Sequence, residues 1–79
     1  MAQINSPLPG VLFHRPDPDS PPFKISGDTV AIGDTLALVE VMKSFLPIEA
    51  EISGTFTGYV GADGAEIAPG DVVCEIEET

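Results

Sequence analysis

The sequence contains few of the residues from which metal centres and catalytic sites are built. It has one cysteine (Cys74), one histidine (His14) and no tryptophan among 79 residues. A single cysteine excludes an internal disulfide and a cysteine-based metal site. A single histidine leaves no pair of imidazole ligands and no evident partner for a nucleophile. We therefore expect neither a catalytic site nor a metal site.

Basic residues are also scarce. The chain has three basic residues, Arg15, Lys24 and Lys43, and 13 acidic ones, which gives a net charge of −10. Nucleic acids and anionic membranes are bound through positive charge, so neither is an expected partner. The longest strongly apolar run, Leu36–Val39, is too short to span a bilayer, and Met1–Asn5 lacks the features of a signal peptide. We expect a cytoplasmic protein.

Uninterrupted helical patterns are absent as well. Eight glycines and eight prolines divide the chain into short apolar runs rich in valine and isoleucine. Such runs, bounded by Gly, Asp and Pro, predict an all-β protein. The length allows one small domain, residues 1–79, without an interdomain cleft.

An internal repeat is the most informative pattern that is present. Residues 27–40 match residues 64–77, each 37 positions apart, and Gly10–Phe13 resembles Gly54–Thr57, 44 positions apart. The matched residues include these pairs: Gly27 and Gly64, Gly33 and Gly70, Asp34 and Asp71, Glu40 and Glu77. Two copies predict two halves related by a quasi-two-fold axis around one core. At Gly27, Gly33, Gly54, Gly64 and Gly70 we expect turns with unusual φ.

The first half carries seven additional residues, which we place at Pro16–Pro22. This stretch holds half of the prolines, and proline is unsuited to a central strand, so we predict a stiff, protruding loop. Phe13 and Phe23 flank it, and we expect them to pin its base to the core. A tolerated insertion is the alternative. A PxxP ligand at Pro18–Pro21 is disfavoured because both loop ends are fixed and its flanks are acidic.

The segment between the two halves predicts a hairpin with Lys43 at its tip. A two-residue loop at Met42–Lys43 gives one nearly continuous apolar face. The pairs on that face are Val41 with Ser44, Val39 with Leu46, Ala37 with Ile48, and Thr35 with Ala50. Such loops favour Asn-Gly or Asp-Gly because φ is positive there. Met-Lys lacks this advantage, which indicates a functional constraint.

Glu40–Lys43 resembles the Glu-Ala-Met-Lys motif at which biotin is attached. Together with Gly33–Leu36, Ile48–Ala50 and Ser53–Thr55, it makes about residues 5–78 similar to the biotinyl (biotin/lipoyl attachment) domain family. The resemblance implies a flattened β-barrel, or barrel-sandwich hybrid, of two four-stranded antiparallel sheets with the lysine on a hairpin, here at about 35–50. It also implies biotin on Lys43.

The resemblance further implies that a biotin protein ligase recognises three residues before the lysine, Glu40, Val41 and Met42. Val41 replaces the usual alanine, and Ser44 replaces the methionine that commonly follows the lysine. The Pro-rich loop is similar to the protruding thumb of the bacterial acetyl-CoA carboxylase carriers. Its residues are Arg15, Pro16, Asp17, Pro18, Asp19, Ser20, Pro21 and Pro22. Arg15 stands where those carriers have a small hydroxyl residue.

The implied function is that of a non-catalytic carrier subunit of acetyl-CoA carboxylase, which serves fatty acid biosynthesis, or of a related multi-subunit biotin-dependent carboxylase. It would move a carboxyl group from a biotin carboxylase subunit to a carboxyltransferase subunit. A lipoyl domain shares the fold, but its motif carries Asp before the lysine, so Met42 favours biotin. An unmodified barrel that serves assembly is a third alternative. The remaining candidates have structural interpretations: Cys74 as a core residue and His14 as a packing or surface residue.

Overall fold

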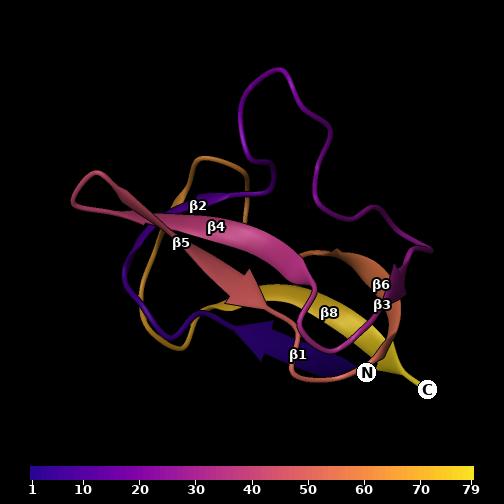
Figure 1. Cartoon of the computed structure of the whole chain (residues 1–79). Helices are drawn as coiled ribbons and strands as arrows, with labels where there is room; N and C mark the ends of the chain where they lie inside the picture. Colours follow the sequence, from indigo (N-terminus) through magenta and orange to yellow (C-terminus); the bar gives the residue numbers. More distant parts are fainter.

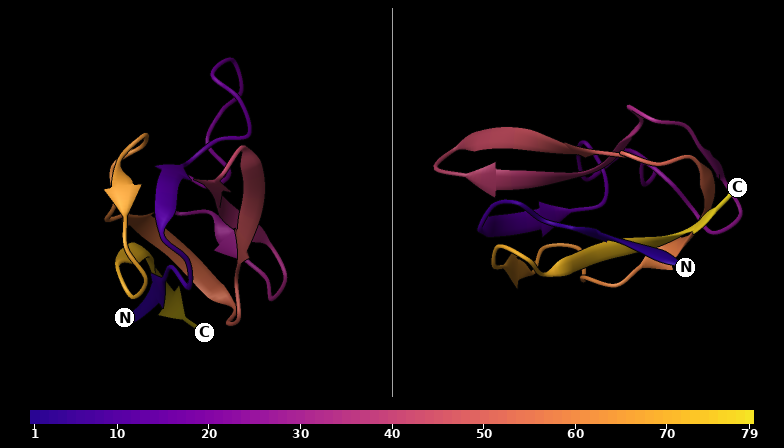
Figure 2. Two further views of the ribbon diagram at one scale, coloured as in Figure 1. Left: turned by 90° about the vertical axis from the view of Figure 1, so that its left-hand side faces the viewer. Right: turned by 90° about the horizontal axis from the view of Figure 1, so that it is seen from below.

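The computed structural model describes residues 1–79 as eight β-strands without a helix. The strands are β1 (Ala2–Asn5), β2 (Gly10–Phe13), β3 (Thr29–Val30), β4 (Thr35–Val41), β5 (Ser44–Glu49), β6 (Gly54–Tyr59), β7 (Glu66–Ile67) and β8 (Val72–Glu78). They form two four-stranded antiparallel sheets, ordered β1-β8-β6-β3 and β5-β4-β2-β7. The sheets pack as two layers (Figure 1, Figure 2). The predicted all-β sandwich of two four-stranded sheets is confirmed.

The two sheets are related by the repeat. Each strand of the first half, β1 to β4, corresponds to the strand numbered four higher in the second half. When every strand is replaced by its counterpart, the order of one sheet becomes the order of the other. Hydrogen bonds repeat in the same way: Gly33 N–H donates to Ala50 O over 2.8 Å, and Gly70 N–H donates to Ser6 O over 2.8 Å. The quasi-two-fold relationship is therefore confirmed. Each half supplies two strands to each sheet, so the two halves are interleaved.

The core lies between the sheets and draws on both halves. It comprises Leu12, Val30, Leu36, Ala37, Val39, Ile48, Ala50, Phe56, Ile67, Val73, Cys74 and Ile76. Two of its pairs, Leu36–Ala37 and Val73–Cys74, are neighbours in sequence and are both fully buried. Adjacent residues of a regular strand face opposite sides, so this burial requires an irregularity.

The irregularity is a β-bulge in each half. Against β5, the register of β4 shifts between Thr35 and Ala37, which turns Leu36 inward. An equivalent shift occurs where β8 pairs with β1. Consequently Thr35 pairs with Glu49, and the predicted pairing of Thr35 with Ala50 is wrong.

Gly54 has a different role from the one predicted. Gly27, Gly33, Gly64 and Gly70 do have positive φ, between 83° and 99°, but Gly54 does not. Instead, a Cβ atom on Gly54 would overlap the carbonyl oxygen of Glu77. A Cβ atom on Gly10, its counterpart in the repeat, would likewise overlap the carbonyl oxygen of Glu40. Glycine is required at Gly54 by the close approach of two strands.

Each sheet leaves one long strand at its edge, β1 in one sheet and β5 in the other. A groove of about 790 Å³ runs along these edges and is lined by residues of both, including Gln3, Asn5, Pro47 and Glu49. Pro47 has no backbone N–H, which limits the pairing of β5 with a further strand. The groove lies along the strand edges rather than at the hairpin tip.

Candidate functional site

Lys43 occupies the tip of the hairpin formed by β4 and β5. The ladder runs from Val41–Ser44 to Ala37–Ile48 as predicted. The φ angles of Met42 and Lys43 are 49° and 68°. Two successive positive φ values characterise the type I′ turn, which favours Asn-Gly. The hairpin and its tip are therefore confirmed, and both turn residues adopt a conformation that L-residues with side chains seldom adopt.

The Lys43 ammonium group is exposed and forms no hydrogen bond or ion pair in the structure. The other lysine is engaged: Lys24 Nζ lies 3.0 Å from Asp34 Oδ2 and 2.9 Å from Thr29 O. The hairpin extends beyond the body of the sandwich, at the end opposite both termini (Figure 1). Lys43 is thus the one lysine presented freely to other molecules.

The three residues before Lys43 do not share one surface. Glu40 lies on the outer face of its sheet, between Phe45 on β5 and Val11 on β2. Val41 is partly buried and packs against the core, whereas Met42 is 93% exposed. Of this trio, Met42 is exposed and Glu40 partly exposed, while Val41 packs at the base of the hairpin.

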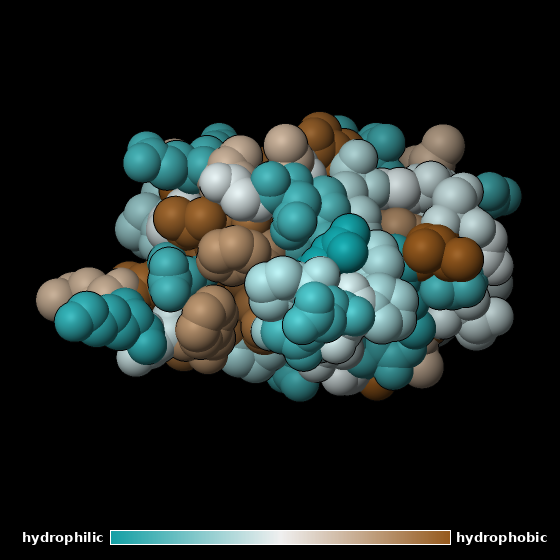
Figure 3. Space-filling model, turned by 90° about the horizontal axis from the view of Figure 1, so that it is seen from above, coloured by the Kyte–Doolittle hydropathy of each residue, from teal (hydrophilic) through white to brown (hydrophobic).

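An exposed apolar group surrounds the tip and was not predicted from the sequence. Phe45 is 53% exposed and Leu46 is 38% exposed, in addition to Met42. The two residues point to opposite faces of β5, so alternation would bury one of them. Neither is fully buried, because the hairpin projects past the sandwich (Figure 3). The sequence does carry a sign of this exposure, because the apolar residues Phe45 and Leu46 occupy both faces of the strand directly after the predicted turn.

The loop expected at Arg15–Pro22 protrudes from the same side of the molecule as β2 and β4 (Figure 1). Asp17 organises it: Oδ1 accepts Asp19 N–H over 3.0 Å, and Oδ2 accepts the Ser20 hydroxyl over 2.8 Å. Such Asx interactions, together with four prolines, restrict the loop without strand pairing. We call this segment the thumb.

The base of the thumb is closed differently from the prediction. Phe13 and Phe23 are only partly buried, and neither belongs to the core cluster. The base is closed by the backbone, where Phe23 N–H donates to His14 O over 2.8 Å. The side chain of Phe13 faces outward, 6.0 Å from the Phe45 ring between centroids. It therefore links the thumb to the lysine hairpin.

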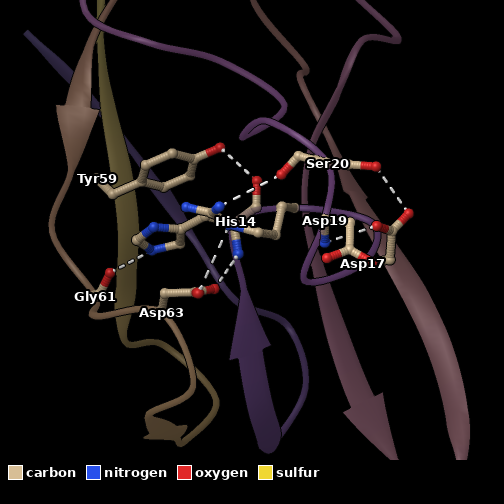
Figure 4. Close-up of polar contacts among 8 residues, drawn as sticks. His14, Asp17, Asp19, Ser20, Tyr59, Gly61 and Asp63 are labelled. Carbon is tan, nitrogen blue, oxygen red and sulfur yellow. Dashed lines mark hydrogen bonds and ion pairs between the residues drawn. The ribbon is translucent and has the colours of Figure 1, made fainter.

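His14 fastens the thumb base to the β6–β7 connection (Figure 4). Its ring stacks on Tyr59 at 3.7 Å between centroids, and Nε2 lies 2.7 Å from Gly61 O. Because a carbonyl oxygen only accepts, Nε2 carries the proton. The His14 backbone N–H donates to Asp63 Oδ1 over 2.7 Å. His14 is a packing residue.

Tyr59 extends this cluster into the core. Its hydroxyl donates to Leu36 O over 2.6 Å, and its ring meets Phe56 edge-on at 4.8 Å. Burial raises the pKa of Tyr59 to about 12. Burial likewise raises the pKa of the Cys74 thiol to about 12, and the thiol is fully enclosed. Cys74 is therefore a core residue, as predicted, and an unreactive one.

A cavity of about 300 Å³ separates the thumb from the lysine hairpin. We call it the thumb pocket, and its lining residues are Phe13, Arg15, Pro16, Asp17, Pro18, Phe45 and Asp63. Phe45 lies two positions after Lys43, so the pocket opens beside the hairpin. No group of three His, Cys, Asp or Glu side chains is arranged to hold a metal ion. The structure also contains no helical segment with the length and hydropathy needed to span a membrane.

Comparison with known proteins agrees with this geometry. The model of the biotin/lipoyl family, described as biotin-requiring enzyme, matches residues 2–76. The chain belongs to this family. The lysine-tipped hairpin and the interleaved sandwich are thus those of a biotin/lipoyl attachment domain, and the resemblance inferred from the sequence is confirmed.

Several relatives are named as biotin carboxyl carrier proteins of acetyl-CoA carboxylase. The chloroplastic protein 2 of Arabidopsis thaliana is 37% identical over 65 residues, covering 82% of this chain and 26% of the relative. The protein of Streptococcus pyogenes is 43% identical over 54 residues, covering 68% and 32%. That of Pseudomonas aeruginosa is 36% identical over 64 residues, covering 81% and 41%. The chain therefore spans less than half the length of these relatives.

Proposed function

We propose that this chain is the biotinyl carrier domain of a biotin-dependent carboxylase, with biotin joined through an amide to Lys43 Nζ. The observation that carries the proposal is the Met42–Lys43 turn, in which two residues with side chains both adopt positive φ. Each such residue costs about 1–2 kcal/mol relative to glycine. A turn chosen only for folding would contain glycine, so this turn is maintained for the lysine and its neighbour.

The position of Lys43 suits a tether. Amide formation removes the positive charge, which no neighbouring group in the structure compensates. It takes the formal net charge from −10 to −11. The attached biotin supplies the chemistry of carboxyl transfer, and this chain supplies a rigid mount that carries it between two active sites. Because the biotin is tethered, its effective concentration is high at both active sites.

The family and the names of the relatives support the partners that we propose. A biotin protein ligase would recognise the hairpin through Glu40 and Met42, with Val41 holding its base. A biotin carboxylase subunit and a carboxyltransferase subunit would act on the biotin in turn, as in acetyl-CoA carboxylase. The chain itself would be a non-catalytic carrier, acting in the cytoplasm. The exposed Met42, Phe45 and Leu46 supply the apolar contact surface at the tip.

The residues of the thumb fit a tethered biotin. The thumb pocket has an aromatic side formed by Phe13 and Phe45, which suits the apolar part of a bicyclic ring. Polar groups of Arg15 and Asp63 line the same pocket, and a ureido group needs such partners. The thumb residues Arg15–Pro22 would therefore serve the arm when it is not in a partner active site.

Lipoylation of Lys43 is the closest alternative, and Met42 argues against it. The experiment is co-expression with a biotin protein ligase followed by intact-mass measurement and avidin blotting. We expect one biotinyl group on the wild type and none on Lys43→Arg. Lys24→Arg is the matched control, because it changes the only other lysine, and it should be modified normally.

Two outcomes would contradict the proposal. A lipoyl-sized adduct in a host that supplies both ligases would identify a lipoyl domain. No adduct on a folded wild-type protein would identify an assembly module that uses the same fold without a cofactor.

A further inference from the structure

Arg15 is the one positive charge at the thumb pocket, and the hydrogen bonds of its side chain are incomplete. Its Nη1 donates to Ser20 O over 3.3 Å. Its Nε is shielded from solvent and has no hydrogen-bond partner. The nearest carboxylate oxygen, Asp63 Oδ2, lies 3.9 Å away, which is too far for a hydrogen bond. A guanidinium group has five N–H donors and no acceptor, so most of its donor capacity is unused.

The acidic side chains of the pocket are already engaged elsewhere. Both carboxylate oxygens of Asp17 accept hydrogen bonds from within the thumb, from Asp19 N–H and from the Ser20 hydroxyl. Asp63 Oδ1 accepts the backbone N–H of His14 (Figure 4). The Arg15 charge is therefore only loosely paired, and Arg15 lines the pocket together with Phe13 and Phe45.

The charge of the rest of the molecule makes this position unusual. Of the three cations, Lys24 is paired with Asp34, and Lys43 becomes neutral in the proposed modified form. The remaining surface is dominated by 13 acidic residues. An anion on the end of the arm is repelled almost everywhere else on this protein. Arg15 is the one cation that lines the pocket beside the hairpin, where the carboxylates of Asp17 and Asp63 oppose its charge.

We propose that Arg15 makes the thumb pocket selective for the carboxylated, anionic head of the biotin arm over its neutral, uncarboxylated form. The inference rests on the proposed attachment of biotin to Lys43. The guanidinium donates to the carboxylate, and the aromatic wall covers the apolar part of the ring. Charge-assisted bonds of this kind are shorter and stronger than those to a neutral acceptor. The pocket then retains the loaded arm in transit.

The first test reads Arg15 directly. Arg15 is the only arginine, so the protein has a single arginine Nε–H resonance in ¹H–¹⁵N spectra. The sample is carrier biotinylated on Lys43, before and after carboxylation by a purified biotin carboxylase with ATP and bicarbonate. We expect the Nε–H resonance to shift when the arm becomes carboxylated and to move little on biotinylation alone. Equal shifts in both states, or none in either, would overturn the inference.

The second test measures how long the carboxyl group stays on the isolated carrier. Its loss releases CO₂, and a proton from water restores the ureido N–H. The comparison is wild type, Arg15→Gln and the matched control Lys24→Gln, which removes one positive charge outside the pocket. We expect roughly three- to tenfold faster loss in Arg15→Gln alone. High salt should reduce the difference.

The two tests separate this inference from simpler explanations. If Arg15 only braced the thumb through Ser20, its substitution would disturb thumb amide signals equally in the neutral and carboxylated states. Unchanged lifetimes in a biotinylated Arg15→Gln carrier would refute the inference and leave the proposed function standing. Absence of biotin on the wild type refutes the proposed function first and is detected by avidin before either test.

Discussion

Lys24 reaches from the end of the thumb loop to Asp34, at the turn before β4, and places Nζ 3.0 Å from Oδ2. Asp34 Oδ2 also accepts Ala31 N–H over 2.9 Å. In the other half, Asp71 accepts Ala68 N–H over 2.8 Å but has no lysine. The two aspartates can therefore be compared directly, because Asp34 is paired with a lysine and Asp71, its counterpart in the repeat, is not.

The effect of pH on stability should distinguish these aspartates. The Ala31 N–H and then Lys24 lower the pKa of Asp34. Its contribution is therefore complete above the unfolded pKa, about 3.9, and is lost as the pH falls through the lower folded pKa. We expect Asp34→Asn to lower Tm more than Asp71→Asn at pH 7. The difference in Tm between the wild type and Asp34→Asn should disappear at acid pH. Equal losses from both substitutions would contradict a role for Lys24.

Replacing the turn with its preferred residues should stabilise the unmodified protein. Met42→Asn combined with Lys43→Gly puts a residue that tolerates positive φ at one turn position and a residue without a side chain at the other. The expected gain is about 2 kcal/mol, or roughly 10 °C in Tm. Thermal unfolding measures it, and the two single variants show how it is divided. An unchanged Tm would mean that the turn stores no strain.

Removing the thumb should leave the fold intact. Deletion of residues 16–22 leaves six residues between Phe13 and Gly27, the same number that joins Thr57 to Gly64 in the other half. Since the second half closes with this length, we expect a folded domain with Tm changed by only a few degrees. Circular dichroism and amide spectra test this. Loss of cooperative unfolding would show that the thumb is part of the folding unit.

Tyr59 provides a spectroscopic check of the thumb base. It is the only tyrosine and the chain has no tryptophan, so phenol absorbance reports it alone. We expect its ionisation near pH 12 rather than 10. Because the folded pKa is raised, stability should fall as the pH rises from 10 towards 12. Tyr59→Phe removes the bond to Leu36 O and should cost about 1 kcal/mol. Ionisation near pH 10 in the folded protein would contradict the buried hydroxyl.

The sequence predicted the parts of the fold that follow from repetition and alternation. Matching glycines and aspartates gave the two halves, and alternation along residues 37–48 gave the register around Lys43. The repeat is found by comparing two segments of the sequence, and the register by alternation between neighbouring residues, so neither requires knowledge of contacts between strands. The family resemblance added the identity of the cofactor, which no spacing rule contains.

Other features depend on contacts between distant segments. The bulge at Leu36 arises from packing two consecutive residues into one core, and a two-residue period does not reveal it. Similarly, Gly54 is required by the Glu77 carbonyl on a neighbouring strand. The attachment of the thumb through His14, Gly61 and Asp63 joins residues 47 or more positions apart.

The interleaving of the halves means that the lysine hairpin is supported only when both halves have folded together. β4 pairs with β2, and the core behind it is closed by residues of β8, which belongs to the other half. An isolated two-stranded hairpin is at best marginally stable. A ligase that requires the shaped turn would therefore leave chains that end before β8 unmodified, and biotin would mark only domains in which all eight strands have folded.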